Sequence, residues 1–244
     1  MSTFVFPSHL DRRKMPLHVA IIMDGNRRWA RQQGWRAIRG HTIGARTTRE
    51  IILECSDLGV RALTLYTFST ENWKRSRPEV AALMRLIARN LNDQLPSLIE
   101  NRVRVRHIGR RDDLPDYLLR AIDRSVAQTQ ALDGMELSLA LNYGGRAEIR
   151  DAFHTLLRQV QSGALKPENV SEATIEQALY TRGLPEPDLM IRTGGEMRTS
   201  NFLPWQLAYA ELWVTPTLWP DFKPQELHRA IEEFQTRDRR FGSS

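Results

Sequence analysis

The chain has 244 residues, of which 41% are hydrophobic, so it is long enough for one well-buried domain and short for two. Its formal net charge is +6, and nearly all of the positive charge is arginine, because Lys14, Lys74, Lys166 and Lys223 are the only lysines. No run of eighteen apolar residues exists and residues 1–14 are polar and charged, so we expect neither a membrane span nor a secretory signal.

Two interpretations of the arginine excess stay open at this point. Arginines such as Arg120, Arg124 and Arg158 fit a solvated surface, whereas others could bind phosphate oxygens in bidentate fashion. A nucleic-acid-binding domain would also be basic, and it is the rival class of protein. The single cysteine, Cys55, follows Ile51 and precedes Leu58 in a helical pattern, which predicts a buried apolar residue and suits a reducing cytoplasm.

Along the chain, apolar runs with strand character alternate with amphipathic stretches. The alternation predicts βαβ units and a mostly parallel six-stranded sheet flanked by helices, an α/β fold in one domain over residues 17–244. Residues 1–16 are expected to form a flexible N-terminal segment. The six predicted strands are residues 18–23, 62–68, 103–108, 137–142, 189–192 and 212–215.

The clearest predicted helix begins at Pro78, a favourable first helical residue, and is interrupted by Pro96, which should bend its last third. Its apolar residues recur every three or four positions. They fit ordinary core packing or, alternatively, the wall of a hydrocarbon channel, together with Leu137, Leu139 and Leu141 of a later strand. The helical stripe comprises Val80, Leu83, Met84, Ile87, Leu91, Leu95 and Leu98.

Polar residues follow three of the predicted strands directly. The first strand ends in Asp-Gly-Asn-Arg-Arg (24–28), the second in Ser-Thr-Glu-Asn-Trp-Lys-Arg (69–75), and the fifth in a Gly-Gly segment that runs from Arg192 to Ser200. Ligands of parallel α/β sheets bind beyond the carboxyl ends of strands. Carboxylates suit Mg²⁺, and guanidinium, hydroxyl and backbone N–H groups suit phosphates. The sequence therefore predicts an anion and metal site at one edge of the sheet.

Five blocks in this order make the chain resemble the cis-prenyltransferase family, and within it the bacterial undecaprenyl diphosphate synthases. The blocks are residues 23–30, 68–75, 142–146, 192–202 and 205–212, and the resemblance covers residues 17–242. It implies a transferase that condenses isopentenyl diphosphate with an allylic diphosphate, farnesyl diphosphate by expectation. The implied product is a Z-polyprenyl diphosphate, undecaprenyl diphosphate for the cell-wall lipid carrier. A short-chain synthase of the same family is the alternative.

The resemblance also implies roles for individual residues. Asp24 and Glu211 would hold Mg²⁺, Asp24 would be an essential catalytic acid, and Asn72 would be a proton acceptor. Isopentenyl diphosphate would lie on Arg192, Arg198, Thr199 and Ser200. A mobile loop made of Ser69, Thr70, Glu71, Trp73 and Arg75 would close over both substrates. The allylic diphosphate would be surrounded by Gly25, Asn26, Arg27, Arg28, Trp29 and His41.

One position departs from the family pattern, which places an arginine four residues before the equivalent of His41. This chain has Ala37 there, flanked by Arg36 and Arg39, and the sequence does not decide which of the two reaches the phosphate. The resemblance further implies a homodimer with residues 205–213 near the interface and Arg240, Phe241 and Gly242 contributing. It implies a cytoplasmic protein with transient contact to the inner face of the membrane through its lipid product, and no nucleic-acid partner.

The segment Asp112-Asp113-Leu114-Pro115-Asp116 matches the DDxxD pattern with which trans-type prenyl synthases hold Mg²⁺. Those enzymes are all-helical and carry two such motifs, whereas this motif stands alone in an alternating α/β pattern. We therefore interpret Asp112 and Asp113 as caps of a helix whose first turn contains Pro115.

Overall fold

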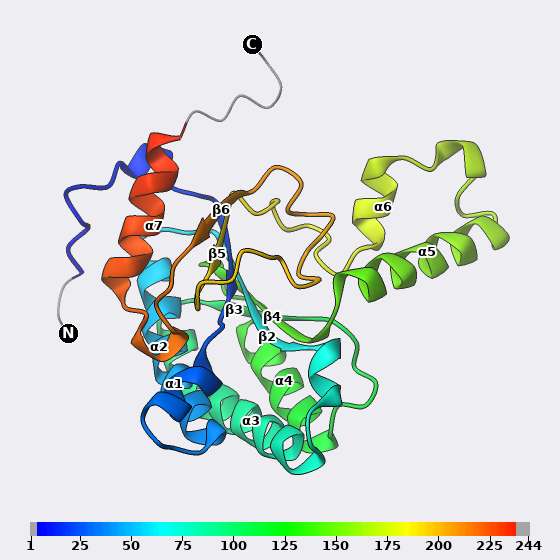
Figure 1. The fold of residues 1–244 in the computed structure, drawn as a ribbon. Helices are drawn as coiled ribbons and strands as arrows, with labels where there is room; N and C mark the ends of the chain where they lie inside the picture. The colour runs from blue at the N-terminus through cyan, green and yellow to red at the C-terminus, as the bar shows by residue number, and fades with distance from the viewer. Residues whose placement is uncertain (1–3, 238–244) are drawn as a thin grey trace.

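The computed structural model describes residues 4–237, so the expectations for Arg240, Phe241 and Gly242 lie outside the described residues. The described residues form one six-stranded sheet in which every paired strand is parallel, in the order β3-β4-β2-β1-β5-β6 (Figure 1). The strands are β1 (His18–Ile22), β2 (Ala62–Ser69), β3 (Arg104–Ile108), β4 (Glu136–Tyr143), β5 (Leu189–Arg192) and β6 (Glu211–Val214). The predicted α/β fold and all six predicted strands are confirmed, and no strand end is shifted by more than one residue.

Burial explains why β1 reads as a continuous apolar run after His18 and why β4 is mostly apolar. All five residues of β1 and all eight of β4 are buried, because both faces of the sheet are covered at those positions. The edge strand β6 buries only Trp213 of its four residues. The extent to which a strand is buried therefore depends on its position in the sheet.

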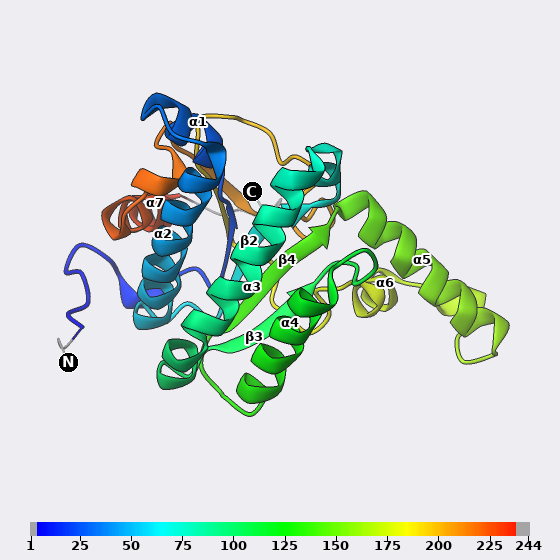
Figure 2. The same ribbon diagram turned by 90° about the horizontal axis from the view of Figure 1, so that it is seen from below.

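One face of the sheet is covered by four helices (Figures 1 and 2). These are α2 (Ala37–Asp57), α3 (Arg77–Glu100), α4 (Asp116–Thr129) and α7 (Pro224–Thr236), and their apolar faces share one core with Val19 and Ile21 of β1. Cys55 belongs to this core, fully buried as predicted, and burial raises the pKa of its thiol. The helix α3 contains Pro96 and continues to Glu100.

The opposite face carries a smaller cluster, in which Phe202 and Leu203 cover Ala20, Ala140 and Met190. The helices α5 (Gly145–Gln161) and α6 (Glu172–Ala178) project from this side as an arm, drawn in green and yellow in Figure 1. The short helix α1 (Asn26–Gln32) lies against α2, and the 3₁₀ turns are η1 (Arg12–Lys14), η2 (Thr70–Lys74), η3 (Pro167–Asn169) and η4 (Trp219–Asp221).

The segment that precedes β1 touches the body of the protein. Leu10 is buried in the larger core, and the backbone N–H of Asp11 donates to Oε1 of Gln235 in α7 at 3.0 Å. None of the helices within residues 4–237 is long and apolar enough to cross a bilayer.

The interpretation of Asp112 and Asp113 as helix caps is wrong. The N-cap of α4 is Pro115, and no side chain caps that helix. Asp113 has a left-handed backbone (φ 65°), and the carbonyl oxygen of Asp112 instead accepts from Nδ2 of Asn142 at 2.8 Å. The helix starts at Asp116, directly after the extended backbone of Pro115, so the carboxylates of Asp112 and Asp113 fall in the preceding turn.

Candidate active site

A tight turn after β1 places Asp24 at the carboxyl edge of the sheet. Gly25 has φ 110°, and a Cβ there would come within 2.8 Å of the Leu218 side chain, so both the backbone and the space require glycine. The carbonyl oxygen of Asp24 accepts from Thr193 Oγ1 at 2.7 Å and from the Trp219 backbone at 3.0 Å. The turn is therefore fixed by segments that follow β5 and β6.

Two arginines hold the Asp24 carboxylate. Nη2 of Arg192, at the end of β5, donates to Asp24 Oδ2 at 2.9 Å, and Nη2 of Arg28 in α1 lies 3.3 Å from Oδ1. The Arg192 side chain is only 4% exposed, and its Nε has no hydrogen-bond partner among the described residues. Such a buried cation needs anions around it, which Asp24 supplies only in part.

The loop after β5 brings Ser200 and Arg198 to the same place. Nη1 of Arg192 donates to Ser200 Oγ at 2.8 Å and to the carbonyl oxygen of Arg198. Ser200, Asn201 and Leu203 all have positive φ, a backbone conformation that is costly for residues other than glycine. The Arg198 guanidinium pairs with Glu196 at 2.6 Å, and Glu196 also lies 4.0 Å from Arg28.

The segment Ser69–Arg75 forms the turn η2 and closes over this region. Trp73 Nε1 donates to Asn142 Oδ1 at 2.7 Å, and Asn201 Nδ2 donates to Glu71 Oε1 at 2.9 Å. The amide oxygen of Asn72 accepts from the Ser69 backbone N–H at 3.2 Å, so this side chain stabilises its own turn. The segment is thus tied to β4 and to the loop after β5.

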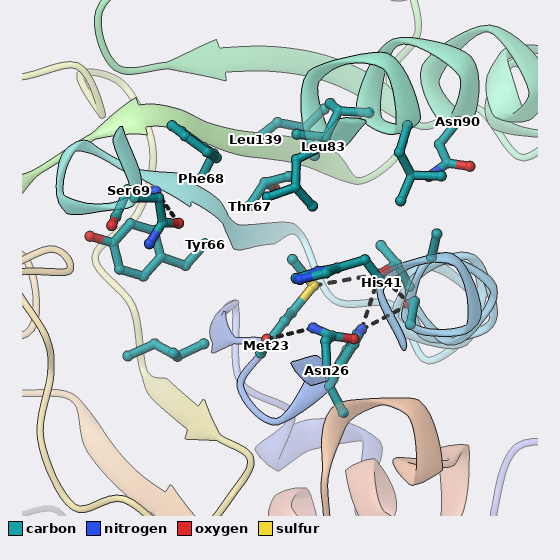
Figure 3. Close-up of a pocket in the computed structure, with 18 of the residues that line it drawn as sticks. Met23, Asn26, His41, Tyr66, Thr67, Phe68, Ser69, Leu83, Asn90 and Leu139 are labelled. Carbon is teal, nitrogen blue, oxygen red and sulfur yellow. Dashed lines mark hydrogen bonds between the residues drawn. The ribbon is translucent and has the colours of Figure 1, made fainter. Parts of the chain in front are cut away.

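Two buried polar atoms without partners belong to side chains at the cavity. Asn26 Oδ1 and His41 Nε2 have no hydrogen-bond partner among the described residues, and both side chains line the same cavity (Figure 3). Burial, reinforced by the guanidiniums of Arg75 and Arg27, lowers the pKa of His41 to about 4. His41 is therefore a neutral imidazole at physiological pH, a hydrogen-bonding group in a cationic surrounding.

A cavity of about 660 Å³ extends from these polar groups into the core. Its apolar wall comes from one side of α3 and from β4, with Leu83 and Leu139 labelled in Figure 3. Leu137 and Leu139 line it as predicted, together with Thr67, whereas Leu141 packs into the core and does not. The lining residues from α3 are Leu83, Leu86, Ile87, Asn90, Leu91, Gln94 and Leu98.

The larger part of the predicted site comes together. Arg28 and Arg192 meet at Asp24, and Arg27 lies 3.6 Å from Glu79, which also pairs with Arg75 at 3.3 Å. The predicted residues that line the cavity itself are Asp24, Asn26, His41, Ser69, Glu71, Asn72, Arg75 and Ser200.

Other predicted residues lie apart from the cavity. Trp29 Nε1 donates to Asp221 Oδ1 at 2.8 Å, so that ring is held against η4 and does not line the cavity. Glu211 is the first residue of β6, where it is paired with Leu189, and its carboxylate binds Arg237 at 2.6 Å. Because all strands are parallel, Glu211 lies at the amino edge of the sheet, opposite Asp24. Arg36 and Arg39 are exposed and neither lines the cavity.

Sequence reasoning missed four residues that organise the site: Asn142, Thr193, Glu196 and Asn201. Each lies inside or next to a recognised block, yet only the fold shows what it contacts. Asn142 has φ 51° and joins Trp73 to Asp112 through its amide. Asparagine tolerates this backbone conformation better than most residues, which is the one signal that the sequence contains.

The groups at Asp24 fit a Mg²⁺ ion that would be bound mainly by substrate phosphates and water. Among residues 4–237, no cluster of three or more His, Cys, Asp or Glu side chains could hold a metal by itself. Mg²⁺ is commonly bound by one or two carboxylates together with substrate phosphates and water. Asp24 supplies one carboxylate, one-third exposed, beside guanidiniums that suit the same phosphates.

The chain is similar to known bacterial proteins along almost its whole length. A family model described as "Putative undecaprenyl diphosphate synthase" matches residues 22–242. An isoprenyl transferase of Geobacillus kaustophilus is 48% identical over 95% of this chain and 90% of its own length. A ditrans,polycis-undecaprenyl-diphosphate synthase ((2E,6E)-farnesyl-diphosphate specific) of Lactiplantibacillus plantarum is 49% identical over 96% and 91% of the two chains.

Two solved structures share the fold over nearly their full length. Lavandulyl diphosphate synthase from Lavandula x intermedia, in complex with dimethylallyl diphosphate, superposes with a TM-score of 0.92 at 39% identity, covering 95% of this chain and 100% of its own. A "probable undecaprenyl diphosphate synthase" from Campylobacter jejuni has a TM-score of 0.76 at 34% identity, covering 93% and 99%.

Proposed function

The chain belongs to the undecaprenyl diphosphate synthase family of cis-prenyltransferases, and we propose that it extends farnesyl diphosphate with isopentenyl diphosphate units to undecaprenyl diphosphate. As a cis-prenyltransferase it adds five-carbon units to a growing prenyl chain, and each added unit carries a Z double bond. The choice of farnesyl diphosphate rests on the name of the Lactiplantibacillus plantarum relative. The product would supply the lipid carrier of cell-wall synthesis.

One observation carries the proposal: the contact between Asp24 and Arg192 at the mouth of a largely apolar cavity. A prenyl diphosphate has a charged head and a hydrocarbon tail, and this geometry offers a cationic rim and an apolar depth to the same molecule. Each methylene group that leaves water contributes about 0.8 kcal/mol, so the cavity can retain a growing tail while diphosphates exchange at its mouth.

The two diphosphates would occupy opposite sides of Asp24. On one side, the His41 ring offers an unpartnered nitrogen to the allylic diphosphate, with Gly25, Asn26, Arg27 and Arg28 beside it. On the other side, Arg192, Arg198, Thr199 and Ser200 would bind isopentenyl diphosphate, since Arg192 and Ser200 are already joined at 2.8 Å. Trp29 would take part only indirectly, by supporting α1 through Asp221.

A Mg²⁺ ion held by Asp24 would neutralise charge on the departing diphosphate. The guanidiniums of Arg28 and Arg192 orient that carboxylate. Glu211 could join the same ion only from a second copy of the chain, because within one chain it lies at the opposite edge of the sheet.

The segment Ser69–Arg75 would exclude water from the reacting carbons. Its contacts with Asn142 and Asn201 close the rim above the cavity, and water would quench a carbocation-like centre. Asn72 is retained as the proposed proton acceptor only in concert with the departing diphosphate, because a neutral amide is a weak base and its oxygen is engaged by Ser69.

We also propose that the protein is a cytoplasmic homodimer with transient membrane contact. The arm formed by α5 exposes Ile149, Phe153 and Leu157 at four-residue steps, a stripe left uncovered by the described part of one chain. Tyr209 and Leu212, within residues 205–213, are also exposed. A second copy would bury both regions.

Product analysis tests the proposal. Radiolabelled isopentenyl diphosphate is supplied with geranyl, farnesyl or geranylgeranyl diphosphate and Mg²⁺, and the products are sized after removal of the diphosphate. We expect chains of about 55 carbons from farnesyl diphosphate, the family length implied by the relatives. Products that end after one or two additions would favour the short-chain alternative, and no incorporation would refute the function.

A further inference from the structure

The corner between α1 and α2 is strongly basic. Residues 25–49 contain seven arginines and no aspartate or glutamate. Arg27 and Arg28 belong to the site described above, and the other five are exposed and make no ion pair among the described residues. These five are Arg31, Arg36, Arg39, Arg46 and Arg49.

Two apolar side chains project at the same corner. Trp35 is 45% exposed and Ile38 is 36% exposed, and the Arg39 guanidinium lies over the Trp35 ring at 5.2 Å. The Trp35 ring also meets Trp29 edge-on at 5.5 Å, which fixes its direction. We call Trp35, Ile38 and the five arginines the basic corner. An aromatic ring beside cations is the composition of segments that bind at the headgroup level of bilayers.

The basic corner adjoins the wall of the cavity. His41, Gly44, Thr48 and Ile52 line the cavity from one face of α2, while the arginines of that helix lie on its exposed side. Figure 2 shows α1 and α2 together along one side of the molecule. A surface that rested on this side would therefore lie beside the helix that encloses the cavity.

We propose that the basic corner docks onto a bilayer that contains anionic lipids, with Trp35 and Ile38 inserted among the headgroups. The arginines would be attracted to the acidic surface, and the two apolar side chains would leave water. The biological purpose rests on the proposed function: the cost of exposing a polyprenyl chain to water grows with every carbon, so the product should pass directly into a membrane.

Vesicle sedimentation without substrates tests the surface by itself. We expect the wild-type protein to bind vesicles that contain phosphatidylcholine and phosphatidylglycerol, and this binding should weaken as the salt concentration rises. It should not bind vesicles of pure phosphatidylcholine. Arg46→Gln/Arg49→Gln should weaken binding about 30-fold, because each cation near an acidic bilayer contributes a factor of about five. Trp35→Ala/Ile38→Ser should also lose binding, and Trp35→Phe should retain most of it.

Matched controls separate the corner from general surface charge. Arg120→Gln/Arg124→Gln removes two exposed arginines of α4 that make no ion pair within residues 4–237, and Val170→Ser removes an apolar side chain that is 43% exposed elsewhere. Neither control should change vesicle binding. Thermal melting of each variant confirms that it is folded. Arg36 and Arg39 are left unchanged because they flank Ala37, the position at which the family pattern has a phosphate-binding arginine.

Three results would overturn the docking proposal: no binding of the wild-type protein to acidic vesicles, equal losses in the controls, or tight binding of a short RNA with none to vesicles. Failure of the proposed function has a different signature. Turnover of isopentenyl diphosphate in detergent should be equal in the wild-type protein and the Arg46→Gln/Arg49→Gln variant. An inactive wild-type protein that still binds vesicles would refute the function and leave the docking surface standing.

Discussion

Asp24 is the side chain on which the proposed chemistry depends most directly. Asp24→Asn keeps the size of the side chain and removes the charge that Arg28 and Arg192 bind. We expect turnover to fall by about 10²–10³-fold, the usual effect of losing one charge-stabilising group. Steady-state incorporation of isopentenyl diphosphate measures the effect.

The DDxxD-like segment provides the control for that experiment. Asp112 and Asp113 are exposed and lie outside the cavity, so Asp112→Asn/Asp113→Asn should retain turnover within about twofold of wild type. A collapse of activity in this variant, with folding preserved, would move the metal site away from Asp24.

His41 should make stability depend on pH. Its pKa is lowered to about 4 in the folded protein, against 6.5 as its ordinary value, so the unfolded chain binds more protons between these limits. The contribution is complete above about pH 6.5 and is lost as pH falls towards 4. The full loss is on the order of 3 kcal/mol. His41→Gln should therefore flatten the pH dependence of the melting temperature over this window, and an unchanged slope would contradict the assignment.

At the scale of elements, two glycines allow α1 to approach α2. A Cβ at Gly40 would lie 2.0 Å from the Asn26 carbonyl oxygen, and one at Gly44 would lie 2.1 Å from Asn26 Oδ1. Gly40→Ala should therefore destabilise the protein by about 1–3 kcal/mol, as overpacking does, and displace the Asn26 side chain from the cavity. Urea unfolding and turnover measure the two effects.

Gly34, in the turn between the same two helices, offers a comparison. It has φ 69°, but a Cβ added there would meet nothing within 4 Å, so Gly34→Ala should cost about 1 kcal/mol of backbone strain and leave turnover unchanged. An equal loss of activity in both variants would show that the close approach of the helices does not matter.

The sequence predicted the strands better than the contacts between them. An apolar run identifies β1, because burial on both faces leaves few polar positions, and β4 is mostly apolar for the same reason. The order of the blocks along the chain identifies the site residues. It does not show at which edge of the sheet each residue lies. Glu211 belongs to a recognised block, yet it starts a strand and so falls at the amino edge of the sheet. Capping propensity predicts Asp112 and Asp113 as helix caps, but Pro115 takes the N-cap position in the structure.

At the scale of the whole molecule, the position of Glu211 yields a complementation test. If Glu211 acts on the site of a partner chain, inactive Asp24→Asn and inactive Glu211→Gln proteins should regain activity when they are mixed and allowed to exchange subunits. A mixed dimer would then hold one site with both carboxylates. Activity is measured against each variant alone.

Phe153→Glu in the Glu211→Gln chain provides the control, because a charge on the exposed stripe of α5 should prevent dimer formation. No recovery with the unmodified pair, despite mixed dimers detected by native mass spectrometry, would mean that Glu211 does not complete a neighbouring site.

The pairing of Asp24 with two guanidiniums also sets an order of affinities. One carboxylate between Arg28 and Arg192 leaves the rim with excess positive charge. The rim therefore repels a divalent cation that arrives alone and attracts an anion. A bound diphosphate reverses that sign. Cation and diphosphate should therefore strengthen each other's binding, and linkage requires the same factor in both directions.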